Sequence, residues 1–202
     1  MVTFIEEGHI YLNSKGKQIP SVSKLVDFAM GDNPYKDVDK RVLEKKAQYG
    51  TRIHALLEEY VSKGGHIDKS KLDVKELIAV DQFTRLMSKY CFYVKNMEQQ
   101  VDYKELYGGR YDLLTQDNIL IDFKTYASID DEKLERFSWQ LGFYYLALRI
   151  EQDKGYIMWL PKGKVGKVIE VPAKSWRECI DCLEQYLHPQ ESLFLWCVAR
   201  LM

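Results

Sequence analysis

The stretch GGRYDLLTQDNILIDFKT (residues 108–125) constrains the fold of this chain more than any other feature. It consists of two strand-like runs separated by a polar turn. The second run contains Asp122 and Lys124 among apolar residues, and because side chains alternate across a strand, these two charged groups must share one face of a sheet. Such a strand is either half-solvated or part of a functional site.

The length of the turn decides which side chain faces Asp122. A three-residue loop at 116–118 brings Asp112 opposite Asp122, with Cβ atoms about 4.5–5.5 Å apart, whereas a two-residue turn at 117–118 would bring Asp112 opposite Phe123. Opposed like charges destabilise a sheet unless a cation lies between them. The three-residue loop therefore predicts a site for Mg²⁺ or Mn²⁺, and a solvated face is the alternative.

Lys124 extends this interpretation from metal binding to catalysis. A lysine beside a metal site can orient or help deprotonate a water molecule, and it can neutralise charge that develops on a phosphate group. The pattern therefore predicts Asp112, Asp122 and Lys124 as catalytic residues of a metal-dependent hydrolytic site. The two carboxylates are also its expected metal ligands.

The composition is that of a globular chain that needs no disulfide or metal in order to fold. Hydrophobic residues make up 46% of the 202 residues, charged residues 29%, and the formal net charge is −1. This charge excludes a polycation that holds nucleic acid by charge alone, but not an enzyme with a local basic surface. Without a signal-peptide pattern or a long apolar window, the chain is expected to be cytoplasmic and to have no membrane partner.

The periodicity and the turn signals predict helices and strands in alternation. The expected elements are a hairpin over 3–20, a short helix over 24–30, a long helix over 36–63 with a candidate break at Gly50, a helix over 71–95, strands over 100–107, 110–115 and 119–125, a helix over 134–150, strands over 155–161 and 167–172, a helix over 174–187 and an apolar segment over 192–201. This order indicates an α/β (α+β) fold with a mixed, mostly antiparallel central sheet flanked by helices. We expect one domain, 1–202, with an N-terminal hairpin and helix extension over about 1–35.

Four motifs in order resemble the PD-(D/E)xK nuclease superfamily. GGRYD followed by IDFKT resembles its core, in which an aspartate on one strand precedes a D/E-x-K on the next. GTRIHALLEEY (50–60) is similar to the G-x-x-x-H helix of the RecB-type branch, and QLGFY (140–144) to its Q-x-x-x-Y motif. This branch includes lambda-exonuclease-like phage enzymes, and the resemblance, which covers about residues 8–145, implies a restriction-endonuclease-like core.

The resemblance implies roles for further residues. His54 lies about 90° from the centre of its helix's apolar stripe, where a histidine is commonly just a boundary residue. The resemblance makes it a metal ligand, together with the backbone carbonyl of Phe123. It also implies that Gln140 and Tyr144 border the active site and bind substrate, whereas the residues alone allow a structural hydrogen bond and core packing.

Two glutamates are weaker candidates for the site. Glu58 follows His54 by one helical turn and either contacts it or is solvated. Glu105 precedes the GGRYD motif and either assists a second metal ion or is a solvated strand residue.

Some RecB-type nucleases hold an iron–sulfur cluster, and the positions of the cysteines indicate whether this chain could do the same. Those relatives place one cysteine before the histidine motif, but here the first is Cys91, after His54. Cys179 and Cys182 have the spacing of core residues on an amphipathic helix, and Cys197 is distant. We therefore do not expect an iron–sulfur cluster.

The function that the resemblance implies is hydrolysis of DNA phosphodiester bonds by a Mg²⁺- or Mn²⁺-dependent nuclease. Its action would be exonuclease-like and used in DNA recombination, repair or phage DNA processing, in the host cytoplasm if the protein is phage-encoded. Candidate partners besides DNA are further copies of the chain or a recombination protein. The alternatives are an inactive nuclease fold that serves as a DNA-binding or interaction module, and a hydrolase of another phosphate ester. The choice between endonuclease and exonuclease, and between DNA and RNA, stays open.

Overall fold

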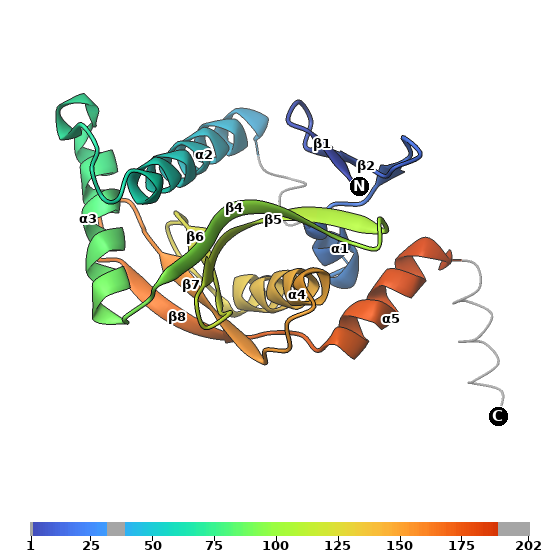
Figure 1. The fold of residues 1–202 in the computed structure, drawn as a ribbon. Helices are drawn as coiled ribbons and strands as arrows, with labels where there is room; N and C mark the ends of the chain where they lie inside the picture. The colour runs from blue at the N-terminus through green and yellow to red at the C-terminus, as the bar shows by residue number, and fades with distance from the viewer. Residues whose placement is uncertain (1, 32–38, 190–202) are drawn as a thin grey trace.

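The computed structural model describes residues 2–31 and 39–189, and its N-terminal part is a small sheet followed by a helix (Figure 1). The sheet contains β1 (Thr3–Ile5), β2 (Ile10–Leu12) and β3 (Gln18–Ile19), paired antiparallel in that order, so the predicted hairpin has three strands. The helix α1 (Val22–Ala29) begins where Ser21 Oγ accepts a hydrogen bond from the Lys24 N–H. This contact satisfies one of the free donors of the first turn.

Two long helices follow. They are α2 (Lys40–Ser62) and α3 (Val74–Lys89), separated by a short 3-10 helix at Lys69–Lys71. The candidate break at Gly50 does not occur, because α2 continues through it. The predicted helix over 71–95 is too long at its end: α3 stops at Lys89, and Cys91 takes a left-handed φ of 53° that a helix cannot continue through.

The central sheet has five strands and the mixed topology that the sequence predicted. The strands are β4 (Val94–Tyr103), β5 (Tyr107–Thr115), β6 (Leu120–Lys124), β7 (Lys154–Trp159) and β8 (Lys167–Pro172), in that spatial order. All neighbours are antiparallel except β6 and β7, which are parallel. A parallel pair needs a long crossover, and α4 (Asp131–Leu148) provides it.

Helices cover both faces of this sheet (Figure 1). On one face, buried side chains of α2 and α3, among them Ile53 and Phe83, pack with Ile121 and Phe123 of β6. On the other face, α1, α4 and α5 (Trp176–Leu187) form a second cluster that includes Leu120. Strand β6 therefore separates two cores, and this accounts for the burial of its apolar residues Leu120, Ile121 and Phe123.

The C-terminal helix α5 contributes its cysteines to the second core. Cys179 and Cys182 are buried there, as their helical spacing predicted. The predicted apolar segment over 192–201, with Cys197, lies outside the described residues. Within the described part of the chain, no helix is long and apolar enough to cross a membrane.

Two helical glycines give a direct test of this packing. A Cβ on Gly142 of α4 would lie 2.7 Å from the Lys174 carbonyl oxygen and 2.8 Å from Cys179 Sγ. Gly142→Ala should therefore destabilise the protein by about 1–3 kcal/mol, because α5 and its preceding loop must move. In Gly50→Ala the nearest atom, Thr125 Oγ1, is 3.6 Å away, so this control should gain up to about 1 kcal/mol from helix propensity. Urea unfolding measures both free energies, and a Gly142→Ala protein as stable as wild type would contradict the packing.

Candidate active site

The β5–β6 hairpin has the register predicted for the three-residue loop. Leu114 pairs with Leu120, and continuing this register places Asp112 opposite Asp122. The alternative two-residue turn, which would have placed Asp112 opposite Phe123, is thereby excluded. Asp122 and Lys124 project from β6 on the same face as Leu120, so the two aspartates and the lysine come together.

The two strands separate at the position of Asp112. Their ladder ends at Leu113 and Ile121, and beyond it the Phe123 N–H donates to Asp112 Oδ2 at 2.6 Å. In a continued ladder this N–H would meet a backbone carbonyl of β5. The expectation that the two carboxylates simply face each other therefore needs a correction, because the Asp112 side chain is turned to the backbone of β6.

Lys124 and Gln140 hold the carboxylate of Asp122. Lys124 Nζ lies 2.5 Å from Asp122 Oδ2, and Gln140 of α4 donates through Nε2 to Oδ1 at 2.7 Å. The Lys124 ammonium also lies 5.1 Å from the centre of the Phe137 ring, which favours a cation at this position. Both oxygens of a buried carboxylate are thus engaged by side chains from β6 and α4.

His54 approaches the same place from α2. Its Nε2 lies 3.2 Å from the Phe123 carbonyl oxygen, and its Nδ1 lies 3.3 Å from Asp112 Oδ1. Its side chain is 26% exposed, in agreement with the boundary position predicted from the helix period. Three predicted ligand groups, from α2, β5 and β6, are therefore neighbours.

Glu98 of β4 belongs to this cluster, although sequence reasoning missed it. Met97 pairs with Leu113 in the β4–β5 ladder, so Glu98 falls opposite Asp112. Glu98 Oε1 lies 3.2 Å from His54 Nδ1, and Oε2 lies 2.8 Å from Arg110 Nε. The predicted strand began only at residue 100, so the sequence offered no register from which to place Glu98.

The cluster thus contains the carboxylates of Glu98, Asp112 and Asp122 on three adjacent strands, and their charges decide the protonation of His54. Burial alone would lower the pKa of His54, but the charges and hydrogen bonds of Asp112 and Glu98 outweigh burial and raise the pKa from 6.5 to about 10. The histidine therefore carries a proton in the metal-free protein at neutral pH.

The pKa values of Asp112 and Asp122 are shifted in opposite directions. Burial would raise the pKa of Asp112, but His54 and Lys124 hold it below its ordinary value. Burial and the charge of Asp112 raise the pKa of Asp122 to about 6, although Lys124 opposes this rise. Neighbouring carboxylates with separated pKa values are common in active sites.

The remaining predicted residues take different positions around the cluster. Tyr144 is buried, and its hydroxyl donates to the Arg110 carbonyl at 2.7 Å. This hydrogen bond links α4 to the backbone of β5. Glu58 is 43% exposed and lies 3.4 Å from Arg110 rather than against His54. Glu105 lies in the β4–β5 turn, where its carboxylate accepts from the Ser14 N–H and hydroxyl at 3.0 and 2.6 Å.

The donor set is suited to a hard divalent cation. Ligand atoms of His54, Glu98 and Asp112 all lie within 4.8 Å of one another, and the Phe123 carbonyl adds an oxygen next to the imidazole. Carboxylate and carbonyl oxygens suit Mg²⁺ and Mn²⁺, and one imidazole favours Mn²⁺ of the two. These residues could therefore hold the predicted metal ion.

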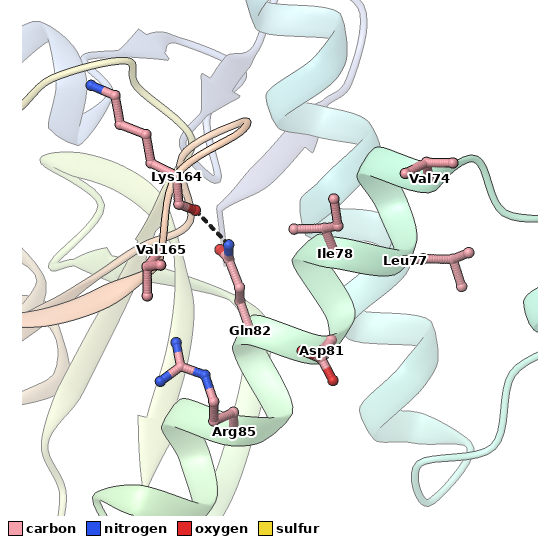
Figure 2. A pocket seen from close by; sticks show the side chains of 8 residues that line it. All are labelled: Val74, Leu77, Ile78, Asp81, Gln82, Arg85, Lys164 and Val165. Carbon is pink, nitrogen blue, oxygen red and sulfur yellow. Dashed lines mark hydrogen bonds between the residues drawn. The ribbon is translucent and has the colours of Figure 1, made fainter.

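A groove of about 450 Å³ lies elsewhere, between α3 and the turn that joins β7 to β8 (Figure 2). Figure 2 shows Gln82 donating to the Lys164 carbonyl across the groove, at 2.7 Å. Its lining residues are Val74, Leu77, Ile78, Asp81, Gln82, Arg85, Lys164 and Val165, and none of them belongs to the predicted site.

No family model matches this sequence, and no curated protein is similar to it. Among solved structures, an alkaline exonuclease from Laribacter hongkongensis is 11% identical, with a TM-score of 0.49 over 91% of this chain and 95% of that one. A phage-related exonuclease from Haemophilus somnus 129PT is also 11% identical, with a TM-score of 0.45 over 91% and 96% of the two chains. Both are exonucleases. Similarity at this level carries no argument about function, which rests below on the site residues themselves.

The raised pKa of His54 predicts how stability depends on pH without metal. A folded-state pKa of about 10 lies above the ordinary 6.5, so the stabilisation is fully present below pH 6.5 and is lost as pH rises towards 10. In EDTA, the free energy of unfolding lost in His54→Gln should be largest at pH 6 and shrink steadily towards pH 9.5. His66→Gln, at an exposed position, is the control. Urea titrations at several pH values measure the difference, and a difference independent of pH would contradict the assignment.

Proposed function

We propose that this chain is a Mg²⁺- or Mn²⁺-dependent DNA nuclease that hydrolyses phosphodiester bonds with exonuclease-like action. The observation that carries the proposal is the convergence of His54, Asp112, Asp122 and Lys124 at the point where β5 and β6 separate. A buried set of carboxylates, one imidazole and one ammonium matches the chemistry of metal-dependent phosphate hydrolysis. DNA recombination, repair or phage DNA processing are the settings that the motif resemblance favours.

His54, Asp112, Asp122 and the carbonyl of Phe123 would hold the metal ion. When bound, it would supply Lewis acidity that polarises a phosphate oxygen and lowers the pKa of water. Gln140 serves this set by fixing Asp122 through a hydrogen bond of 2.7 Å. The proposal also includes the predicted contacts of Gln140 and Tyr144 with the substrate.

Lys124 acts in this proposal as a cation and hydrogen-bond donor. Burial would lower the pKa of its ammonium, but the neighbouring carboxylate of Asp122 outweighs burial and raises the pKa above its ordinary value. A lysine that stays protonated can orient a water molecule and neutralise charge on a phosphate, but cannot accept the proton of that water. Of the roles considered from the sequence, this proposal therefore omits deprotonation of the water by Lys124 and keeps the other two.

Exposed basic side chains are available for the DNA backbone. Arg41, Lys45 and Lys46 are exposed on the first half of α2, the helix that carries His54 further along. Lys162 of the β7–β8 turn lies over the ring of Tyr49, also on α2, at 5.1 Å. Local basic groups of this kind can bind phosphates on a chain whose net charge is only −1.

The proposal is tested by degradation of linear duplex DNA with Mn²⁺, with Mg²⁺ and with excess EDTA. We expect cleavage with both metals and none in EDTA. At low metal concentrations, cleavage should be faster with Mn²⁺ than with Mg²⁺. Duplexes with blocked ends should resist degradation if the action is exonucleolytic. Cleavage in EDTA would overturn the metal mechanism, and DNA binding without cleavage would identify the interaction module instead.

Two substitutions separate the role of Lys124 from metal binding. Lys124→Ala should reduce cleavage by about 100-fold or more, because one electrostatic donor to the reacting phosphate is lost, while Mn²⁺ binding persists. Asp122→Asn should lose cleavage and most of the stabilisation by Mn²⁺, which for wild type is about 2.7 kcal/mol at a hundredfold excess over Kd. Lys154→Ala, at an exposed ion pair with Glu170, is the control.

Calorimetry gives the metal affinities and thermal melts give the stabilisation. Abolished Mn²⁺ binding in Lys124→Ala would contradict the role assigned to that ammonium. Normal stabilisation of Asp122→Asn by Mn²⁺ would show that Asp122 is not a ligand.

A further inference from the structure

Glu98 has an unusual backbone for a strand residue. Its φ is 51°, and of the described non-glycine residues with positive φ it is the one that lies inside a strand. A side chain other than glycine in this left-handed region costs about 1–3 kcal/mol, which the surrounding structure must offset. The register of β4 against β5 also shifts between Val94 and Asn96, just before Glu98. The strained backbone places the Glu98 side chain against His54.

The contact is with the ring nitrogen of His54 that faces away from the Phe123 carbonyl. Glu98 Oε1 lies 3.2 Å from Nδ1, and Asp112 Oδ1 lies 3.3 Å from the same nitrogen, whereas Nε2 lies 3.2 Å from the Phe123 oxygen. A neutral histidine can donate from one nitrogen and bind a metal with the other. A carboxylate that accepts from Nδ1 selects the tautomer in which Nε2 is free to bind.

Arg110 forms an ion pair with this carboxylate. Arg110 Nε lies 2.8 Å from Glu98 Oε2, and the backbone carbonyl of Arg110 is itself fixed by the Tyr144 hydroxyl. The Glu98 side chain is only 7% exposed, so water contributes little to its orientation. Both oxygens of the Glu98 carboxylate are thus in contact with side chains, Oε1 with the imidazole and Oε2 with the guanidinium, an arrangement that suits a carboxylate acting through His54.

We propose that Glu98, held by Arg110, is a positioning residue that orients His54 for metal binding through Nε2. This inference rests on the proposed function, because it concerns the same metal site. It adds to that site a carboxylate from β4 that the motifs did not include. Loss of such a partner to a metal-binding histidine commonly weakens metal affinity by about 10–100-fold.

The test compares Mn²⁺ affinities of wild type, Glu98→Ala and Glu98→Gln by calorimetry, with folding checked by thermal melts. Glu98→Ala should bind Mn²⁺ about 10–100-fold more weakly. Glu98→Gln keeps an oxygen that can accept from Nδ1–H and should regain most of the affinity. The matched control is Glu170→Ala, which removes a strand glutamate from an ion pair of 2.8 Å with Lys154 and should leave the affinity unchanged.

Nitrogen NMR of His54 in the Mg²⁺-loaded protein gives a second readout. At one subsaturating Mg²⁺ concentration, wild type and Glu98→Gln should show Nε2 shifted by the metal with the proton on Nδ1, and Glu98→Ala should show a larger fraction of His54 with Nε2 unshifted. Equal loss of affinity in both variants would make Glu98 a direct ligand, and unchanged affinity in Glu98→Ala would make it merely structural; either result overturns the inference.

The same measurements separate this inference from the proposed function. The expected pattern of affinities without any DNA cleavage would refute the nuclease and leave the role of Glu98 intact. Wild-type protein that binds neither metal would refute both.

Discussion

The arrangement of the site depends on one hydrogen bond, in which the Phe123 N–H donates to Asp112 Oδ2 across the gap between β5 and β6. The regular ladder ends just before this point. A buried N–H without a partner would be costly, so the carboxylate both permits the separation of the strands and satisfies the donor. It also leaves the carbonyl of Phe123 beside His54 Nε2, at 3.2 Å.

Charge balance explains how this polar cluster is tolerated in the interior. The carboxylates of Glu98, Asp112 and Asp122 are matched by three cations from different elements, the protonated His54, Arg110 and Lys124. Burying unpaired charges would cost several kcal/mol each, whereas paired and hydrogen-bonded charges are accommodated. Metal binding by His54 requires loss of its proton, so the cation would replace a charge that the cluster already accommodates.

The two cores give this cluster a rigid frame. Leu120 packs with α4 on one face of β6, while Ile121 and Phe123 pack with α2 and α3 on the other. The charged residues therefore sit on strands whose positions are fixed from both sides. Groups held on packed strands and helices keep the precise geometry that phosphate chemistry requires.

The sequence by itself determined the local part of the site. Alternation placed Asp122 and Lys124 on one face, and the loop length set the register that brings Asp112 beside them, because both follow from the period of a strand. Only the tertiary structure decided that Glu98 joins His54 and Arg110, and that Gln140 holds Asp122. Glu98 reaches the cluster through a positive φ beyond a register shift, and Gln140 through the packing of α4 on β6. Contacts between distant segments depend on such packing, which no local period of the sequence encodes.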